Sequence, residues 1–198
     1  MEPKLSQEMI IKSAFAILAE TQELSKLSMR NLAQKVQVKA PALYWYFKNK
    51  QDLLQKMAEF MENELIIPEP RLPWQERLVQ FMENYYDLYT HFPCGAELEI
   101  NTVPSYASRL EHLEMMIQIL IQAGFSIDRS RQAVFALHNL LIGQLMDAIL
   151  SMKSYVEENA LVGLKASITA HQNQENEKQL FLDSVTIYLQ GLAVQKES

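Results

Sequence analysis

Apolar residues recur with a helical period along most of the chain. Near the N-terminus, Ile10, Ala14 and Leu18 share one face at i, i+4 and i+8, and Ser6 precedes them as a favourable N-cap. This spacing predicts a helix over about 6–20. No run of residues alternates with the period of two that a half-buried strand requires, and no segment repeats. The pattern therefore predicts an all-α fold.

Two short helices are expected next. Ser28 is a favourable N-cap for a helix over 28–36, and Pro41 suits the first turn of a second helix over 41–47. The three residues 37–39 are left to form the turn between them. Short helices joined by so short a turn are typical of a helix-turn-helix unit.

A longer helix follows, and prolines end it. Asn49 and Asp52 resemble a reciprocal cap, and apolar periodicity continues to about Ile66. Pro68, Pro70 and Pro73 form the densest proline stretch of the chain, which marks a boundary. We therefore expect a helix-turn-helix domain over 1–48, a connecting helix over 49–67, and a ligand-binding and dimerisation domain over 68–198.

The larger domain is expected to be a helical bundle. Helices are predicted over 74–89, 96–100, 106–123, 126–152 and 180–194, with Gly124 and Ser126 as cap residues, a weakly patterned helix over 157–170 and a polar loop over 171–177. The segments 128–152 and 178–194 are apolar on too many sides for one buried face, and Gly143 permits close approach of another helix. They are predicted to form the centre of a two-fold dimer.

Composition narrows the class of protein. Of 198 residues, 48% are hydrophobic and 21% charged, with only five Gly and seven Pro, so the chain is expected to be globular rather than disordered. The single cysteine, Cys94, allows no internal disulfide and argues for a reducing compartment. Because no stretch approaches the roughly 18 apolar residues of a membrane span, we expect a cytoplasmic protein with no membrane partner.

Charge is divided unevenly along the chain. Residues 1–56 carry a net charge of +4 and residues 57–198 a net charge of −10. The segment 24–51, named here the basic window, contains no acidic residue; its basic residues are Lys26, Arg30, Lys35, Lys39, Lys48 and Lys50. A basic patch on an acidic body is typical of polyanion binding, although a solvated charged face gives the same pattern.

The two short helices lie inside the basic window, which favours duplex DNA as the partner. In a helix-turn-helix, the first helix braces the second, and the second lies in the major groove. Leu43 and Phe47 share a face and are expected to pack inward, with Trp45 also in the core. Tyr44 and Tyr46 are then left facing outward, where phenols can contact phosphates or base edges.

At these residues the sequence resembles a known family. The blocks Leu32-Ala33-Gln34-Lys35-Val36, Pro41-Ala42-Leu43-Tyr44-Trp45-Tyr46-Phe47 and Lys48-Asn49-Lys50 with Leu53-Leu54 resemble the DNA-binding head of the tetracycline repressor (TetR) family. Further along, Gly95-Ala96, Thr102 with Pro104, and Gln122-Ala123-Gly124-Phe125-Ser126 resemble the body of its tetracycline repressor class. The resemblance covers roughly residues 5–150. In the turn, Gln37 replaces the usual glycine and is strained if its φ is positive.

The resemblance implies a ligand-responsive regulator, most simply a repressor. It implies an all-helical homodimer that binds a palindromic double-stranded operator and is released by a small-molecule effector. The DNA-binding residues that it implies are Ser28, Arg30, Lys39, Ala40, Pro41, Ala42, Leu43, Tyr44, Tyr46, Lys48 and Lys50. A ligand-independent regulator, whose body only dimerises or binds a protein partner, is the alternative.

The effector site is expected in the body. By resemblance and apolar pattern its residues are Ile66, Phe81, Met82, Tyr85, Glu99, Thr102, Met116, Leu120, His138, Asn139 and Asp147. These predict an apolar or aromatic effector, with one cationic or hydrogen-donor group. The resemblance places Glu99 where the class has its magnesium-binding His, so no metal, no cofactor and no magnesium–tetracycline complex are expected.

Glu99 and Asp147 remain open to three interpretations. A buried carboxylate needs a cation, a metal or a hydrogen-bond donor beside it. The two residues therefore either face the effector, or form a hard-oxygen metal site, or lie exposed at helix ends.

An enzyme is not expected. The sequence contains no Gly-rich phosphate loop, no G-x-S-x-G and no H-E-x-x-H, and its four histidines are scattered. No set of residues therefore combines a nucleophile with a base and a stabilising group.

Overall fold

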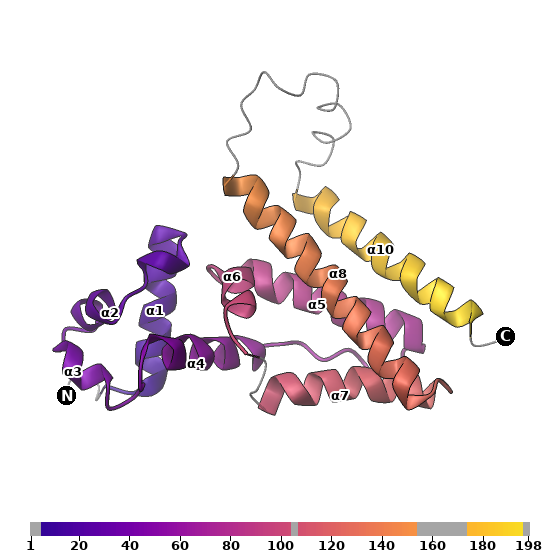
Figure 1. Cartoon of the computed structure of the whole chain (residues 1–198), viewed down its shortest axis with the longest axis horizontal. Coiled ribbons are helices and arrows are strands. Elements are labelled where there is room, and N and C mark those ends of the chain that lie inside the picture. The colour runs from indigo at the N-terminus through magenta and orange to yellow at the C-terminus, as the bar shows by residue number, and fades with distance from the viewer. Residues whose placement is uncertain (1–4, 104–106, 154–173, 196–198) are drawn as a thin grey trace, which may run out of the picture. The chain divides into compact units, whose positions relative to one another are not determined.

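The structure, a computed structural model, describes residues 5–103, 107–153 and 174–195. These residues are helical with connecting loops, and no strand occurs among them, so the all-α prediction is confirmed (Figure 1). The elements are α1 (Gln7–Thr21), η1 (Leu24–Lys26), α2 (Met29–Lys35), α3 (Ala40–Leu43), α4 (Lys50–Glu62), α5 (Trp74–His91), α6 (Gly95–Ile100), α7 (Ala107–Gln122), α8 (Ile127–Lys153) and α10 (Gln174–Val194).

Side-chain caps start the N-terminal helices where the sequence predicts them. Ser6 accepts a hydrogen bond from the Met9 amide at 3.2 Å, and Ser28 accepts one from the Asn31 amide at 3.1 Å. Asn49 likewise accepts from the Asp52 amide at 2.9 Å, which confirms half of the expected reciprocal cap. The other half is shifted by one residue, because the Asp52 carboxylate accepts from the Lys48 amide.

Two predicted helices end earlier than expected. The second short helix stops at Leu43, and the chain then tightens, with the Tyr46 amide bonding to the Leu43 carbonyl three residues back. Residues 44–46 are therefore a turn and not helix. The connecting helix α4 stops at Glu62 rather than about Ile66, because the next two amide donors after Asn63 bond three residues back, in turns.

The chain packs as two units. Unit 1 comprises residues 1–65 and 87–111, and unit 2 comprises residues 66–86 and 112–198. Unit 1 thus contains α6 and the adjoining ends of α5 and α7 in addition to the N-terminal helices. The functional boundaries expected after residues 48 and 67 stay predictions.

Unit 1 has a core formed by the inward faces of α1 to α4 and α6. The rings of Phe15 and Phe92 lie 5.0 Å apart, centroid to centroid, with Phe60 beside both. Its fully buried apolar residues include Ile10, Ala14, Leu18, Leu27, Leu32, Leu43, Leu53, Met57, Ala58, Met61 and Leu98. The periodic apolar positions of the sequence are therefore core positions.

Unit 2 contains the long helices, and α8 and α10 pack against each other (Figure 1). Gly124 has a φ of 93° after α7, and Ser126 accepts from the Arg129 amide at 3.3 Å, so both predicted cap residues are confirmed. Helix α10 begins at Gln174, so residues 174–177 are helical and not the predicted loop. The helix predicted over 157–170 and residues 171–173 lie outside the described residues. Among the described helices, none has the length and apolarity needed to span a bilayer.

Candidate functional site

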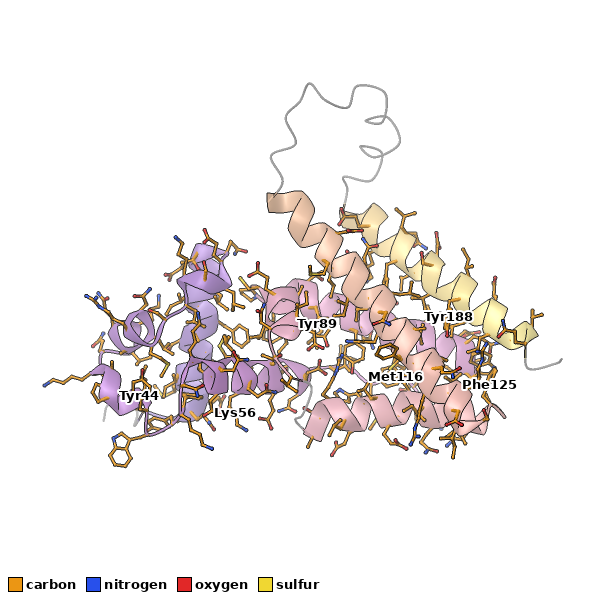
Figure 2. All side chains as sticks on the ribbon, viewed as in Figure 1. Tyr44, Lys56, Tyr89, Met116, Phe125 and Tyr188 are labelled. Atoms are coloured by element: carbon orange, nitrogen blue, oxygen red, sulfur yellow. The ribbon has the colours of Figure 1, made fainter. Side chains whose placement is uncertain are left out.

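The turn after α3 presents two exposed aromatic side chains. Tyr44 is 53% exposed (Figure 2), and Trp45 is 90% exposed. The prediction that Trp45 fills the core is therefore wrong. The cause is the early end of α3, since residues 44–46 form a turn and do not continue the helical face. The spacing of the aromatic residues in the sequence did not indicate that Trp45 would be exposed.

Two other predicted DNA-binding residues have internal roles. Leu43 is fully buried, which corrects its place on the DNA-facing surface, and it packs inward as Phe47 does. The Tyr46 phenol is half-buried and donates a hydrogen bond to the Leu5 carbonyl at 2.7 Å, next to the N-cap of α1. Both residues therefore hold the turn in place from within.

The remaining predicted DNA-binding residues lie at the surface of the head. Arg30, Lys39, Pro41 and Lys48 are exposed, and Ser28, Ala40, Ala42 and Lys50 are half-buried. In the described part of the chain, no ion pair is found for Arg30, Lys39 or Lys48, whereas Lys35 pairs with Glu20 at 2.6 Å. The helix-turn-helix segment therefore carries exposed cations without an ion-pair partner as well as exposed aromatic side chains, and cations of this kind can contact phosphates.

The turn between α2 and α3 keeps its geometry without glycine. Gln37 has a φ of 57°, in the left-handed region. The Val38 amide bonds to the Ala33 carbonyl at 2.9 Å and the Gln37 amide to the Gln34 carbonyl at 3.2 Å, a Schellman pattern. Gln37 thus has the strained backbone conformation expected from the sequence, and these two hydrogen bonds stabilise the turn.

Five predicted effector residues are buried in unit 2, and we name them the apolar wall. Phe81, Met82 and Tyr85 are buried on α5, and Met116 and Leu120 are buried on α7 (Figure 2 labels Met116). Sequence reasoning missed His112, which is also buried and whose ring lies 6.3 Å from that of Tyr85. The spacing of His112, Met116 and Leu120 at i, i+4 and i+8 was the available signal.

The other predicted effector residues are either less buried or part of unit 1. Ile66, Asn139 and Asp147 are exposed, and His138 is half-buried. Asp147 is therefore a surface residue of α8 in the single chain, which is one of its three interpretations. Thr102, in unit 1, is buried, and its hydroxyl donates to the Leu98 carbonyl at 2.8 Å, within the last turn of α6.

Glu99 is ion-paired within the chain. Arg109 Nη2 lies 2.9 Å from Glu99 Oε1, and Arg109 Nη1 lies 3.0 Å from Glu62 Oε1. All three side chains are buried, and Arg109 is only 2% exposed. Tyr89 (Figure 2) accepts a hydrogen bond from Arg109 and donates one to Glu62. We name these four residues the Arg109 cluster.

The Arg109 cluster answers the question about Glu99 that the sequence left open. The partner of Glu99 that the structure shows is a guanidinium ten residues along the chain. In the residues that the structure describes, no three His, Cys, Asp or Glu side chains gather as a metal site. Sequence reasoning missed Arg109 and Glu62, since periodicity does not identify the partner of a buried charge.

Comparison with known proteins extends over both units. The model of "Bacterial regulatory proteins, tetR family" matches residues 10–57, and that of "Tetracyclin repressor-like, C-terminal domain" matches residues 67–195. The class A tetracycline repressor protein from transposon 1721 of Escherichia coli is 29% identical over 147 residues, which cover 73% of this chain and 67% of that protein. The class D tetracycline repressor protein of Escherichia coli is 25% identical over 201 residues, which cover 97% of this chain and 91% of that protein.

Solved structures agree on the fold. The crystal structure of TetR from Acinetobacter baumannii AYE superposes with a TM-score of 0.81 at 23% identity, covering 98% of this chain and all of that one. Together with an exposed aromatic and basic surface on a helix-turn-helix, these matches establish the class of protein. The chain belongs to the TetR family of bacterial regulatory proteins and is a DNA-binding transcription regulator, not an enzyme.

Proposed function

We propose that the chain is a homodimeric repressor that binds a palindromic operator and is released by a small-molecule effector. The observation that carries the dimer is an exposed apolar stripe along α10. Leu180, Ile187 and Val194 repeat every seven residues, and Ile187 is 68% exposed. Ser184 and Gly191 lie between them on the same face. An exposed stripe of this length and period is typical of a helix that packs against another subunit.

Glycines support the same interface. A Cβ placed on Gly191 or on Gly143 of α8 would meet open space in the single chain, so packing within the chain does not require glycine there. Small residues on an apolar face allow a partner helix to approach closely. On α8, Ile127 and the 66% exposed Phe135 are further exposed apolar side chains. Two copies of α8 and α10 would then form a four-helix interface.

The head supplies the contacts to DNA. Tyr44 and Trp45 are proposed to contact the groove and its backbone, and Arg30, Lys39 and Lys48 to neutralise phosphates, with Ser28, Ala40, Pro41, Ala42 and Lys50 around them. If about four to six phosphates are neutralised per dimer, log K falls with log[salt] with a slope of roughly −4 to −5. Two heads on a two-fold axis require half-sites about 34–36 Å apart, or a multiple of it.

The effector is proposed to bind at the apolar wall of unit 2. Phe81, Met82, Tyr85, Met116 and Leu120 offer aromatic and adaptable thioether surface, and methionine accommodates irregular ligands. His112 adds an imidazole that can donate or accept a hydrogen bond. Because Glu99 already binds Arg109, the effector is not required to bring a cation or a metal for it.

One selection experiment tests the operator and the dimer. Duplexes with a random central segment are selected with the purified chain and sequenced, and the protein's mass is measured by sedimentation at micromolar concentration. We expect an inverted repeat with half-sites about one helical turn apart, or a multiple, and a dimer. A single asymmetric half-site bound by a monomer contradicts the proposal.

The effector is tested by the release of that operator. Two probes are compared by thermal shift and band shift: rhodamine 6G, which is cationic, apolar and aromatic, and tetracycline with Mg²⁺. We expect rhodamine 6G to stabilise the protein and release DNA, an effect that Phe81→Ala reduces, and tetracycline with Mg²⁺ to do neither. If Phe81→Ala leaves the response to rhodamine 6G unchanged, the site is wrongly placed. If neither probe stabilises the protein or releases DNA, the ligand-independent alternative is favoured.

A further inference from the structure

In the segment that leads into α2, both backbone polar groups of Leu24 are hydrogen-bonded to side chains from other helices. The Leu24 amide donates a hydrogen bond to Glu97 Oε2 of α6 at 3.3 Å. The carbonyl of the same Leu24 accepts from Lys50 Nζ, the first residue of α4, at 3.5 Å. Leu24 lies five residues before Met29, where α2 begins. The start of the helix-turn-helix therefore depends on where α6 places Glu97.

Helix α6 is held on its other side by the Arg109 cluster. Glu99 follows Glu97 by two residues, which is about 200° around a helix, so the two carboxylates point in roughly opposite directions. Glu97 is half-buried and binds the head, whereas Glu99 is buried and binds Arg109. A helix of six residues is too short to be stable by itself. The contacts of Glu97 and Glu99 therefore help to stabilise it.

The guanidinium of Arg109 links α6 to a fixed point on α4. Its Nη2 binds Glu99 and its Nη1 binds Glu62, so one planar group sets the distance between the two helices. Gln55 of α4 also accepts from the Val103 amide at 3.2 Å and donates to the Val103 carbonyl at 2.6 Å. Polar contacts with α4 thus add to the burial of Leu98 in holding α6 within unit 1.

We propose that Arg109 is a positioning residue for DNA binding, which acts through α6 and Glu97 on the backbone of Leu24. It lies far along the chain from the proposed DNA-binding residues, and its side chain is buried. It determines instead whether Glu97 reaches the Leu24 amide. Losing that contact releases the loop before α2 and costs DNA affinity, because the head must then be ordered on binding.

A double-mutant cycle tests this route. Operator affinity is measured by fluorescence anisotropy for Glu97→Ala, Arg109→Lys and the double variant. Lysine keeps the charge but not the two-armed fork. We expect each single change to weaken binding about fivefold, the loss of one ordinary hydrogen bond. The double variant is expected to bind no more weakly than the weaker single variant.

A merely structural role gives a different result. Arg109 and Glu97 bind different partners, so independent effects multiply to about 25-fold in the double variant, and that outcome overturns the proposal. Arg71→Lys, at an exposed loop position, is the matched control and leaves affinity unchanged. Circular dichroism and sedimentation show whether each variant is folded and retains the oligomeric state of the unaltered chain.

If Arg109→Lys does not fold, a second pair of variants tests the contact between Glu97 and Leu24. Glu97→Gln keeps an oxygen that accepts from the Leu24 amide, and Glu97→Ala does not. Glutamine is expected to retain operator affinity, and alanine to lose about fivefold. If Glu97→Ala binds as tightly as the unaltered chain, Arg109 has no route to the head and the proposal fails, while DNA binding itself stands.

Discussion

The interior of unit 1 and the interior of unit 2 are stabilised by different chemistry. Among the described residues, every buried charged side chain lies in unit 1, where Arg109 binds Glu62 and Glu99. Unit 2 is packed by apolar and aromatic contacts, such as Tyr86 with Phe181 at 5.5 Å between ring centroids. Ion pairs with defined geometry suit a head that must present one arrangement to DNA. Apolar surfaces that adapt suit the dimerisation and effector binding that we propose for unit 2.

The largest effect is expected from breaking the Arg109 cluster. Arg109→Met leaves two carboxylates buried without their cation, so the free energy of unfolding should fall by about 3–5 kcal/mol. Urea denaturation followed by circular dichroism measures it. The matched change Arg71→Met, at an exposed position, should cost less than about 0.5 kcal/mol. Equal losses in the two variants would show that the cluster does not stabilise unit 1.

The complementary change in unit 2 should act on assembly. Ile187→Glu places a charge at the centre of the α10 stripe, where a partner helix would bury it, and should weaken the dimer at least about 100-fold. Sedimentation across a concentration series measures the dissociation constant. Gln179→Glu adds the same charge at an exposed position outside the stripe and should leave the dimer intact. A dimer equally stable in both variants would place the interface elsewhere.

The surface of the head should respond without a change in folding. Trp45→Ala removes a side chain that is 90% exposed, so the free energy of unfolding should change by less than about 0.5 kcal/mol. Operator affinity should fall about tenfold if Trp45 contacts DNA. Anisotropy with the selected operator, paired with urea denaturation, separates the two quantities. Unaltered affinity would remove Trp45 from the proposed interface.

The smallest effect is expected at the turn of the helix-turn-helix. Gln37 has a positive φ, so Gln37→Gly should relieve strain and raise the free energy of unfolding by about 0.5–1 kcal/mol. Gln34→Gly, three residues earlier inside α2, should lower it by a similar amount because glycine is unfavourable within a helix. Opposite signs in urea denaturation confirm the turn geometry, and a loss in both variants contradicts it.

Much of the fold could be predicted from short-range pattern. Ser6, Ser28, Asn49 and Gly124 act within four residues of their own position, through a capping bond or a left-handed backbone conformation. Apolar periodicity likewise identified the buried faces, including Phe81 and Met116 of the candidate effector wall. Those features depend on neighbours along the chain, so the sequence by itself determined them.

Tertiary structure decided which groups meet across the chain. Glu99 finds Arg109 on another helix, and Arg109 finds Glu62 forty-seven residues earlier, so a carboxylate whose partner the sequence left open is ion-paired within the chain. The turn at residues 44–46 brings Trp45 into solvent, although Leu43 and Phe47, two residues away on either side, are buried. A buried charge takes whichever partner the packing brings within 3 Å or so, and no local period encodes that choice.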